Sequence, residues 1–245
     1  MNKILKAAGF LFAMTMTVAL MQSCNSEGEY VEHGGTICHS YWTFSFGTIY
    51  DTLPEVNPAT FENIKDWAGK DDKHVYFKAV LIPGADPATV KAKKYPLLCD
   101  KRDYYYKGVP LHVNSVSNFE VVKWNEDDFW AIDDRYAFYD SLRIEPKDIK
   151  SFKIQCYNVA VDSEHVYRYG KILPLADPET YVEDWKGFYS RDKAHIWYMG
   201  DLMKDVDYET FDIDDNGAHD KNGHFYRGER ISEQRWKELK EQEAQ

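Results

Sequence analysis

Short apolar runs alternate with polar turns along most of the chain, and this pattern returns about every 29 residues. Each copy opens with Asp, continues through a polar stretch into three residues of high strand propensity, and has a small residue eight positions after the Asp. An aliphatic residue follows at position eleven and an apolar residue at position nineteen. The opening residues are Asp71, Asp100, Asp133, Asp162, Asp192 and Asp220. Several columns in register indicate tandem copies of one small structural element.

Each repeat is expected to hold two or three short strands and one helical turn. In the copy that opens at Asp100, Tyr104–Tyr106 is predicted to be a strand, and Lys107-Gly108 a turn in which positive φ is tolerated. Asp-Pro pairs such as Asp86-Pro87 fit a helix N-cap followed by Pro at the first helical position, which predicts a single turn of helix. A third extended segment, such as 119–124, leads to the next Asp.

A repeat of this length cannot bury a core of its own, so neighbouring copies must stack. We therefore expect a mainly β protein of about seven tandem β-hairpin repeats, arranged as an open array or a curved antiparallel sheet. A closed, propeller-like ring is the alternative, but four-stranded blades usually need about 40–45 residues. The aliphatic column that should fill the interior is Leu53, Ile82, Leu111, Ile144, Leu173, Met203 and Ile231.

The remaining segments differ from the repeats in composition. The earliest copy lacks the Asp opening, and counting back from Leu53 places its start near Trp42, so the repeat domain is expected to cover residues 42–240. Residues 24–41 are expected to be a tether. The tail from Ser232 predicts a short charged capping helix, with Trp236 and Leu239 facing inward.

The first 23 residues have the features of a signal peptide. Two lysines precede an uncharged segment that is too short to span a bilayer, and Leu20-Met21-Gln22-Ser23-Cys24 follows. This run resembles a bacterial lipoprotein signal, in which the Cys becomes the lipidated first residue. The resemblance implies a lipid anchor on Cys24 and a place in the cell envelope, at the outer membrane. Ordinary secretion with an incidental Cys is the alternative.

Charge narrows the range of partners. The chain has 30 Lys and Arg against 41 Asp and Glu, a net charge of −11, which argues against nucleic acid as a ligand. Removal of residues 1–23 leaves 28 basic and 41 acidic residues, a net charge of −13, so the anchor rather than the surface would hold the protein on a membrane. Cys38, Cys99 and Cys156 can form one disulfide at most and are expected to be small buried residues.

The best-kept copies are Asp100 to Gly108 and Asp192 to Gly200, which follow the order Asp-Lys-x-x-hydrophobic-Tyr-Tyr-x-Gly, with Trp197 in place of the first Tyr in the second copy. This core resembles the DKNYY repeat family of bacterial envelope proteins over about residues 42–240. The family has no established activity, so the resemblance implies a setting and an architecture but no reaction.

Two sets of residues are candidates for binding. Strand residues alternate faces, so one of two adjacent aromatic columns could form an exposed binding face for glycans or proteins, whereas packing of both columns in the core is the alternative. The candidate ring column is Tyr106, Tyr139, Tyr198 and Tyr226.

The second set has the spacing D-x-D-x-N-G, which resembles a calcium loop, although an ordinary polar turn also explains it. The candidate calcium ligands are Asp212, Asp214, Asn216 and Asp220.

No nucleophile elbow, phosphate-binding loop, dinucleotide fingerprint or zinc-protease helix occurs in the sequence. The expected function is therefore that of a membrane-anchored, non-catalytic interaction or scaffold module with an unknown envelope protein or glycan as its partner. A carbohydrate-binding lipoprotein and an uncharacterised hydrolase are the alternatives.

Overall fold

The computed structural model of the chain describes residues 28–125, 128–183, 188–214 and 217–243. The chain divides into an N-terminal body, Met1–Val116, and a C-terminal body, Ser117–Gln245, and each is described by itself. Within the described residues no helix is long and apolar enough to cross a bilayer.

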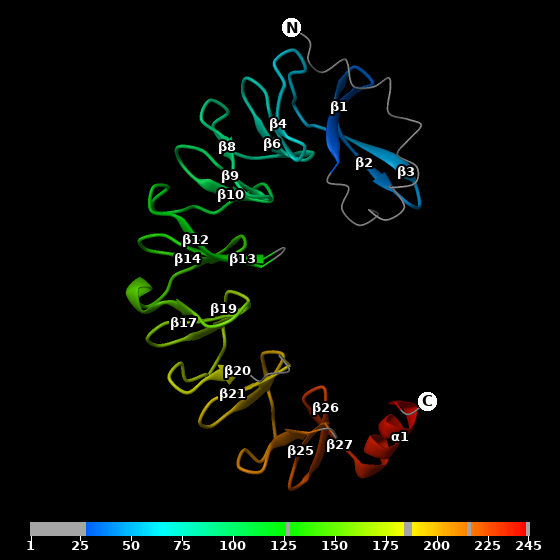
Figure 1. Cartoon of the computed structure of the whole chain (residues 1–245), viewed down its shortest axis with the longest axis vertical. Coiled ribbons are helices and arrows are strands. Elements are labelled where there is room, and N and C mark those ends of the chain that lie inside the picture. The colour runs from blue at the N-terminus through cyan, green and yellow to red at the C-terminus, as the bar shows by residue number, and fades with distance from the viewer. Residues whose placement is uncertain (1–27, 126–127, 184–187, 215–216, 244–245) are drawn as a thin grey trace. The chain divides into compact units, whose positions relative to one another are not determined.

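The N-terminal body contains three antiparallel sheets that follow one another in chain order (Figure 1). The first sheet has three strands and the next two have four strands each. Their strands are β1 (Glu29–His33), β2 (Thr36–Thr43) and β3 (Gly47–Thr52); β4 (Glu62–Lys65), β5 (Ala68–Lys70), β6 (Val75–Phe77) and β7 (Val80–Leu81); and β8 (Lys91–Ala92), β9 (Leu97–Cys99), β10 (Tyr104–Tyr106) and β11 (Val109–Pro110).

The C-terminal body contains four four-stranded sheets and the terminal helix. Its strands are β12 (Glu120–Asn125), β13 (Asp128–Ile132), β14 (Ala137–Tyr139) and β15 (Leu142–Ile144); β16 (Lys153–Ile154), β17 (Val159–Val161), β18 (Val166–Arg168) and β19 (Lys171–Ile172); β20 (Val182–Glu183), β21 (Tyr189–Arg191), β22 (Ile196–Tyr198) and β23 (Asp201–Leu202); and β24 (Asp212–Asp214), β25 (Gly217–Asp220), β26 (Gly223–Tyr226) and β27 (Glu229–Ile231). A 3₁₀ turn, Ile149–Ser151, precedes β16, and α1 (Glu233–Glu243) ends the body.

The prediction of a mainly β repeat array is confirmed: the described strands form seven separate antiparallel sheets rather than one closed barrel. The prediction of two or three strands per repeat was too low. Four strands fit into about 29 residues because several strands, such as β7 and β11, are only two residues long. The extended segment before each Asp is itself a hairpin, as β12 and β13 show.

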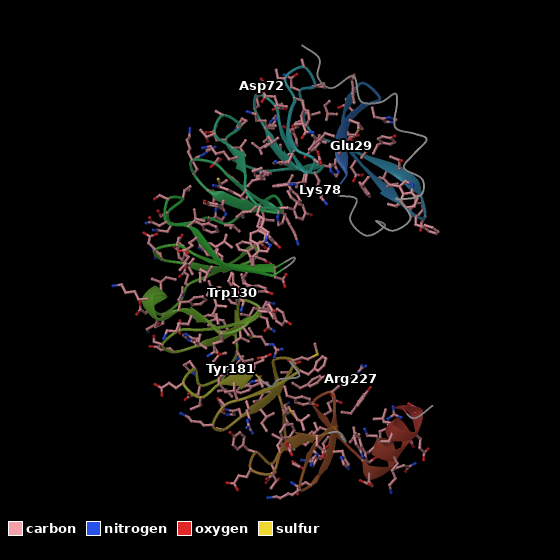
Figure 2. The ribbon with its side chains drawn as sticks, viewed as in Figure 1. Glu29, Asp72, Lys78, Trp130, Tyr181 and Arg227 are labelled. Atoms are coloured by element: carbon pink, nitrogen blue, oxygen red, sulfur yellow. The ribbon has the colours of Figure 1, made fainter. Side chains whose placement is uncertain are left out.

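The cores lie between successive sheets, as the stacking argument predicts. Val75 and Phe77 of the second sheet share one apolar cluster with Leu98 and Tyr105 of the third. In the C-terminal body, Trp130 and Tyr181 are buried within the stacked sheets (Figure 2). Six members of the aliphatic column, Leu53, Ile82, Leu111, Ile144, Leu173 and Met203, are between 1% and 6% exposed. Within each body, a sheet therefore depends on its neighbour for burial.

The predicted helical turn is smaller than expected. At Asp86 it is an isolated turn, in which the backbone N–H groups of Thr89 and Val90 donate to the Asp86 carbonyl at 3.2 and 3.0 Å. Among the described residues the segment reaches 3₁₀ geometry only at Ile149–Ser151. The Asp86 side chain accepts a hydrogen bond from a backbone donor of the turn, so the turn does not have to extend into a longer helix.

The predicted start of the repeat domain and the tether were wrong. Residues 29–41 form β1 and most of β2 instead of a tether. The backbone N–H of Leu53 donates to the Ile37 carbonyl, as that of Ile82 donates to Val75, so Ile37 is the equivalent of Val75. The first copy therefore starts in phase at His33, and the count from Leu53 failed because the hairpin between β2 and β3 is longer than in later repeats.

The capping helix is present close to its predicted position. The Ser232 hydroxyl accepts a hydrogen bond from the Arg235 backbone N–H at 3.2 Å and caps the helix start. Trp236 and Leu239 are half-buried, and the Trp236 ring stacks on His224 with a centroid distance of 4.3 Å.

Candidate functional site

The Asp that opens each repeat is a buried carboxylate surrounded by donors. In the third repeat, Asp100 Oδ1 accepts hydrogen bonds from the backbone N–H groups of Arg102 and Asp103 at 2.7 and 3.0 Å. Its Oδ2 accepts from the backbone N–H of Asp86 at 2.6 Å and from the Tyr105 hydroxyl at 2.8 Å. Asp100 is only 4% exposed, and these four donors compensate for its burial.

The same arrangement recurs in other repeats, with variation in one donor. Tyr76 and Tyr167 supply the hydroxyl to Asp71 and Asp162, at 3.2 and 2.7 Å. In the last repeat Phe225 occupies the position of this Tyr and has no hydroxyl. Arg230 instead donates to both oxygens of Asp220, at 2.8 and 2.6 Å. The carboxylate is thus kept while its partner changes.

The electrostatics of this site disfavour proton transfer. Burial raises the pKa of Asp71, but hydrogen bonds from the backbone N–H groups of Asn57, Lys73 and His74 outweigh it and lower the pKa to about 2. The pKa values of Asp100, Asp162 and Asp192 are lowered in the same way, by backbone donors that outweigh burial. At neutral pH each group is an ionised acceptor without a proton to give.

The other signature residues connect the same two turns. The Thr89 hydroxyl accepts from the Lys101 backbone N–H at 3.2 Å, and Lys101 Nζ lies 3.0 Å from Asp86 Oδ2. The equivalent ion pairs Lys193–Asp177 and Lys221–Asp207 are also formed. The signature therefore ties the Asp-Pro turn of one repeat to the opening hairpin of the next repeat.

The aromatic columns lie mainly inside the array. The first column, Tyr76, Tyr105, Phe138, Tyr167, Trp197 and Phe225, is at most 2% exposed. In the candidate ligand-binding column, Tyr106 and Tyr139 are 4% and 7% exposed, Tyr198 is half-buried, and Tyr226 is 38% exposed. An exposed ladder of four rings is thus not formed, because the turn glycine of the next repeat packs on this column. At Gly170 an added Cβ would lie 2.8 Å from Tyr139 Cβ.

Tyr198 and Tyr226 are nevertheless brought together at one surface groove of the C-terminal body. The groove has a volume of about 550 Å³, and its described lining includes Phe188, Trp236 and Lys240. The rings of Phe188 and Tyr198 stack with an interplanar angle of 23°, and Phe188 is 53% exposed. Within the described chain, Tyr198 and Tyr226 are the only members of the predicted ring column that line a groove together with several other aromatic residues.

The predicted calcium ligands do not converge. Asp212 and Asp214 are exposed on β24, whereas Asp220 is buried in its ion pair with Arg230. Asn216 lies outside the described residues. No group of three or more His, Cys, Asp or Glu side chains within the described ranges is placed to hold a metal ion. Asp220 is the structural carboxylate of the last repeat rather than a loop ligand.

The cysteines of the described residues are free thiols that differ in burial. Cys38 and Cys99 are buried free thiols, as expected for small core residues, and Cys156 is a half-buried free thiol. Cys24, the predicted site of lipidation, lies outside the described residues.

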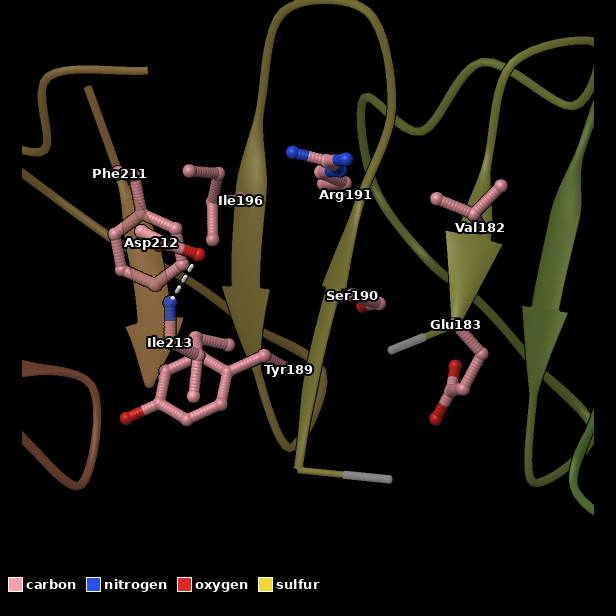
Figure 3. Close-up of a pocket in the computed structure, with 9 residues that line it drawn as sticks. All are labelled: Val182, Glu183, Tyr189, Ser190, Arg191, Ile196, Phe211, Asp212 and Ile213. Atoms are coloured by element: carbon pink, nitrogen blue, oxygen red, sulfur yellow. Dashed lines mark hydrogen bonds between the residues drawn. The ribbon is translucent and has the colours of Figure 1, made fainter. Parts of the chain in front are cut away.

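A second concavity of about 350 Å³ lies between the sheets that contain β22 and β24 (Figure 3). Its polar lining includes Glu183, Ser190 and Arg191. The Glu183 carboxylate accepts from the Tyr181 hydroxyl at 2.7 Å and pairs with Arg168 at 3.1 Å. Because this carboxylate is already neutralised and hydrogen-bonded, it is poorly suited to activate a nucleophile.

The two most exposed aromatic residues of the described chain, Phe44 and Phe46, lie elsewhere, at the end of the β2–β3 hairpin. Phe44 and Phe46 are 91% and 81% exposed, and Trp42 and Tyr50 are 52% and 43% exposed. The repeat pattern does not reveal this feature, because the aromatic turn occurs only once in the sequence. The available signal was that residues 41–50 contain no charged residue, in a chain of which 29% is charged.

Taken together, the sheets and the recurring carboxylates define a β-repeat protein whose signature residues maintain the fold. Residues 25–109 match the family model of the DKNYY family, which confirms the predicted resemblance in this part of the chain. The matched region includes the complete first repeat, and the repeats of the C-terminal body keep the same buried Asp. No curated protein and no solved structure matches the chain.

Proposed function

We propose that the chain is a cell-envelope lipoprotein, anchored at the outer membrane through Cys24, whose repeat array is a non-catalytic interaction or scaffold module. The observation that carries the proposal is the use of the signature residues. The recurring Asp, Lys, Thr and Tyr residues bond to one another, within a repeat or between one repeat and the next, and the Asp residues are acceptors saturated by internal donors. Their recurrence is explained by folding, which leaves the exposed surface for partners.

The lipid anchor is tested with the full-length chain, expressed in bacteria that process lipoproteins. We expect mass spectrometry to find an acylated Cys24 as the first residue and the protein to remain with the membrane fraction. Cys24→Ala should abolish both, whereas Cys156→Ala, the matched control, should change neither. An unmodified Cys24, or cleavage elsewhere, would contradict the anchor.

The interaction role is tested by chemical cross-linking of the anchored chain in intact envelopes. We expect a partner whose cross-link is lost when exposed residues of one repeat are changed and kept when those of another repeat are changed. Turnover of a substrate by the purified chain, with no specific cross-link, would assign the protein to the hydrolase alternative instead.

Glycan binding is a second candidate, supported by the groove that Tyr198 and Tyr226 share. Its described lining combines aromatic residues with the cations of Arg227 and Lys240, a combination suited to stacking on sugar faces. The six aromatic residues are Phe188, Tyr189, Tyr198, Phe225, Tyr226 and Trp236. Calorimetric titration with envelope oligosaccharides should show binding that Tyr226→Ala weakens about tenfold. Tyr169→Ala, which removes a ring that is 49% exposed outside this groove, should leave binding unchanged. Equal binding by both variants would remove this candidate.

A further inference from the structure

The β2–β3 hairpin is an uncharged aromatic projection from an acidic protein. Six residue pairs join its strands, from Cys38–Thr52 to Thr43–Gly47. Residues 41–50 read YWTFSFGTIY, with five aromatic residues and no charge. Phe44 and Phe46 at the turn are 91% and 81% exposed, so both of these large apolar side chains face solvent. Exposed apolar surface of this kind marks a contact site.

The strand register places the outer end of the hairpin near Glu29, which follows Cys24 closely in the sequence. β1 runs antiparallel to β2, and Glu29, its first residue, is paired with Ser40, three residues before Thr43. The four residues between Cys24 and Glu29 allow the two Cα atoms to be at most about 17 Å apart. Four strand residues from Ser40 to Phe44 cover about 13 Å. An acyl chain on Cys24 and the aromatic turn can therefore reach the same surface.

We propose that the turn of the β2–β3 hairpin inserts into the lipid bilayer that holds the acyl anchor. This inference rests on the proposed function and specifies its membrane contact. Trp and Tyr favour the interface between headgroups and acyl chains, and Phe adds apolar area below it. Insertion from the Tyr41–Ile49 pair to the turn corresponds to about 10 Å, the depth at which peripheral segments lie.

Charge favours a bilayer contact limited to this turn. The carboxylates of Glu29 and Asp51 are exposed at the base of the hairpin, where they would remain in water. The mature chain carries 28 basic and 41 acidic residues, so anionic headgroups repel its body. A zwitterionic bilayer removes this repulsion and still accepts the aromatic side chains. Two points of attachment hold a protein more firmly than the anchor alone.

The experiment uses full-length protein purified from bacterial membranes and incorporated into phosphatidylcholine–phosphatidylethanolamine vesicles with brominated acyl chains. Bromine quenches only tryptophan that enters the bilayer. We expect quenching of the wild-type protein and of Trp236→Phe, the matched control, and loss of quenching in Trp42→Phe. The double variant Phe44→Ser/Phe46→Ser, which retains Trp42, should also lose it.

Quenching that persists unchanged in Trp42→Phe, or is absent from the wild-type protein, would overturn the inference. Sedimentation of the same samples without vesicles tests a second copy as the occupant. A wild-type dimer that Phe44→Ser/Phe46→Ser dissociates, without quenching, would assign the turn to self-association. Mass spectrometry of the same preparation reports the state of Cys24, so failure of the anchor is distinguished from failure of the hairpin to insert.

Discussion

Two hairpins of the N-terminal body, β10–β11 and β2–β3, show how the same element serves different purposes. The β10–β11 hairpin has two residue pairs, and its turn at Lys107 and Gly108 has φ angles of 49° and 83°. An added Cβ on Gly108 would lie 3.3 Å from Phe77 Cβ, so this turn packs against the preceding sheet. The β2–β3 hairpin has six pairs, and its outer end is exposed.

The difference teaches that recurrence marks the scaffold and departure from it marks available surface. In the β2–β3 hairpin, only the base residues Ile37 and Leu53 belong to an apolar core cluster of the described chain. The short hairpins are fixed by the neighbouring repeat, whereas the long one extends beyond it. The free energy of unfolding should therefore change strongly on substitution at the recurring positions and hardly on substitution at the aromatic turn.

The largest effect is expected from acid, because it acts on all recurring carboxylates together. The pKa of Asp71 is lowered from 3.8 to about 2, so its contribution is fully present above about pH 4 and is lost as the pH falls through 2. Asp71 alone accounts for about 2 kcal/mol, and the lowered pKa values of Asp100, Asp162 and Asp192 add to it. Urea unfolding followed by circular dichroism should show a plateau above pH 5 and a steep loss below pH 4. Constant stability down to pH 2.5 would contradict the role of these carboxylates.

A single substitution at the carboxylate should have the next largest effect. Asp100→Asn replaces one oxygen that accepts hydrogen bonds with an amide that donates, and leaves two buried donors without an acceptor. We expect a loss of about 3 kcal/mol, measured by urea unfolding. Asp66→Asn, at an exposed Asp of the same body, should cost less than about 0.5 kcal/mol. Similar losses for both variants would show that net charge, rather than the buried acceptor, matters.

The contact between a turn glycine and the preceding repeat gives a smaller effect. Gly170 has a φ of 73°, and an added Cβ would lie 2.8 Å from Tyr139 Cβ, so Gly170→Ala adds both strain and a clash. A loss of about 2–3 kcal/mol is expected. Gly200 has a φ of 96° but only an ordinary contact of 3.4 Å with Arg168, so Gly200→Ala should cost about 1 kcal/mol. Equal losses would mean that backbone strain alone is measured and that the sheets are not in close contact here.

Much of the scaffold could be predicted from the sequence because its constraints recur. The aliphatic column is spaced by the repeat length, so burial of Leu53 and Leu111 followed from periodicity alone. The four-stranded sheet was harder to predict, since strands of two residues such as β11 are too short to show alternation. The fates of the two aromatic columns were open because strand alternation says which rings share a face but not what covers that face.

The candidate surface could be predicted less well. Asp220 has the spacing of a calcium loop, but its partner Arg230 lies ten residues away, and only the fold shows that they meet. The start of the first repeat was displaced because extra hairpin residues break a count based on constant spacing. The aromatic turn could not be predicted from the repeat pattern, because a feature that occurs once has no equivalent in the other repeats.

The smallest effect on the free energy of unfolding is expected at the aromatic turn, and this value tests the difference between the β2–β3 and β10–β11 hairpins most directly. Phe44→Ser/Phe46→Ser removes two side chains that are 91% and 81% exposed, so the free energy of unfolding should change by less than about 0.5 kcal/mol. Leu111→Ala, at a position 1% exposed beneath the short hairpin, should cost about 2–5 kcal/mol. Urea unfolding of the two variants measures both values. A loss above about 1 kcal/mol for the double variant would mean that the phenylalanines support the fold, and the argument that this hairpin is free to contact a membrane would lose its basis.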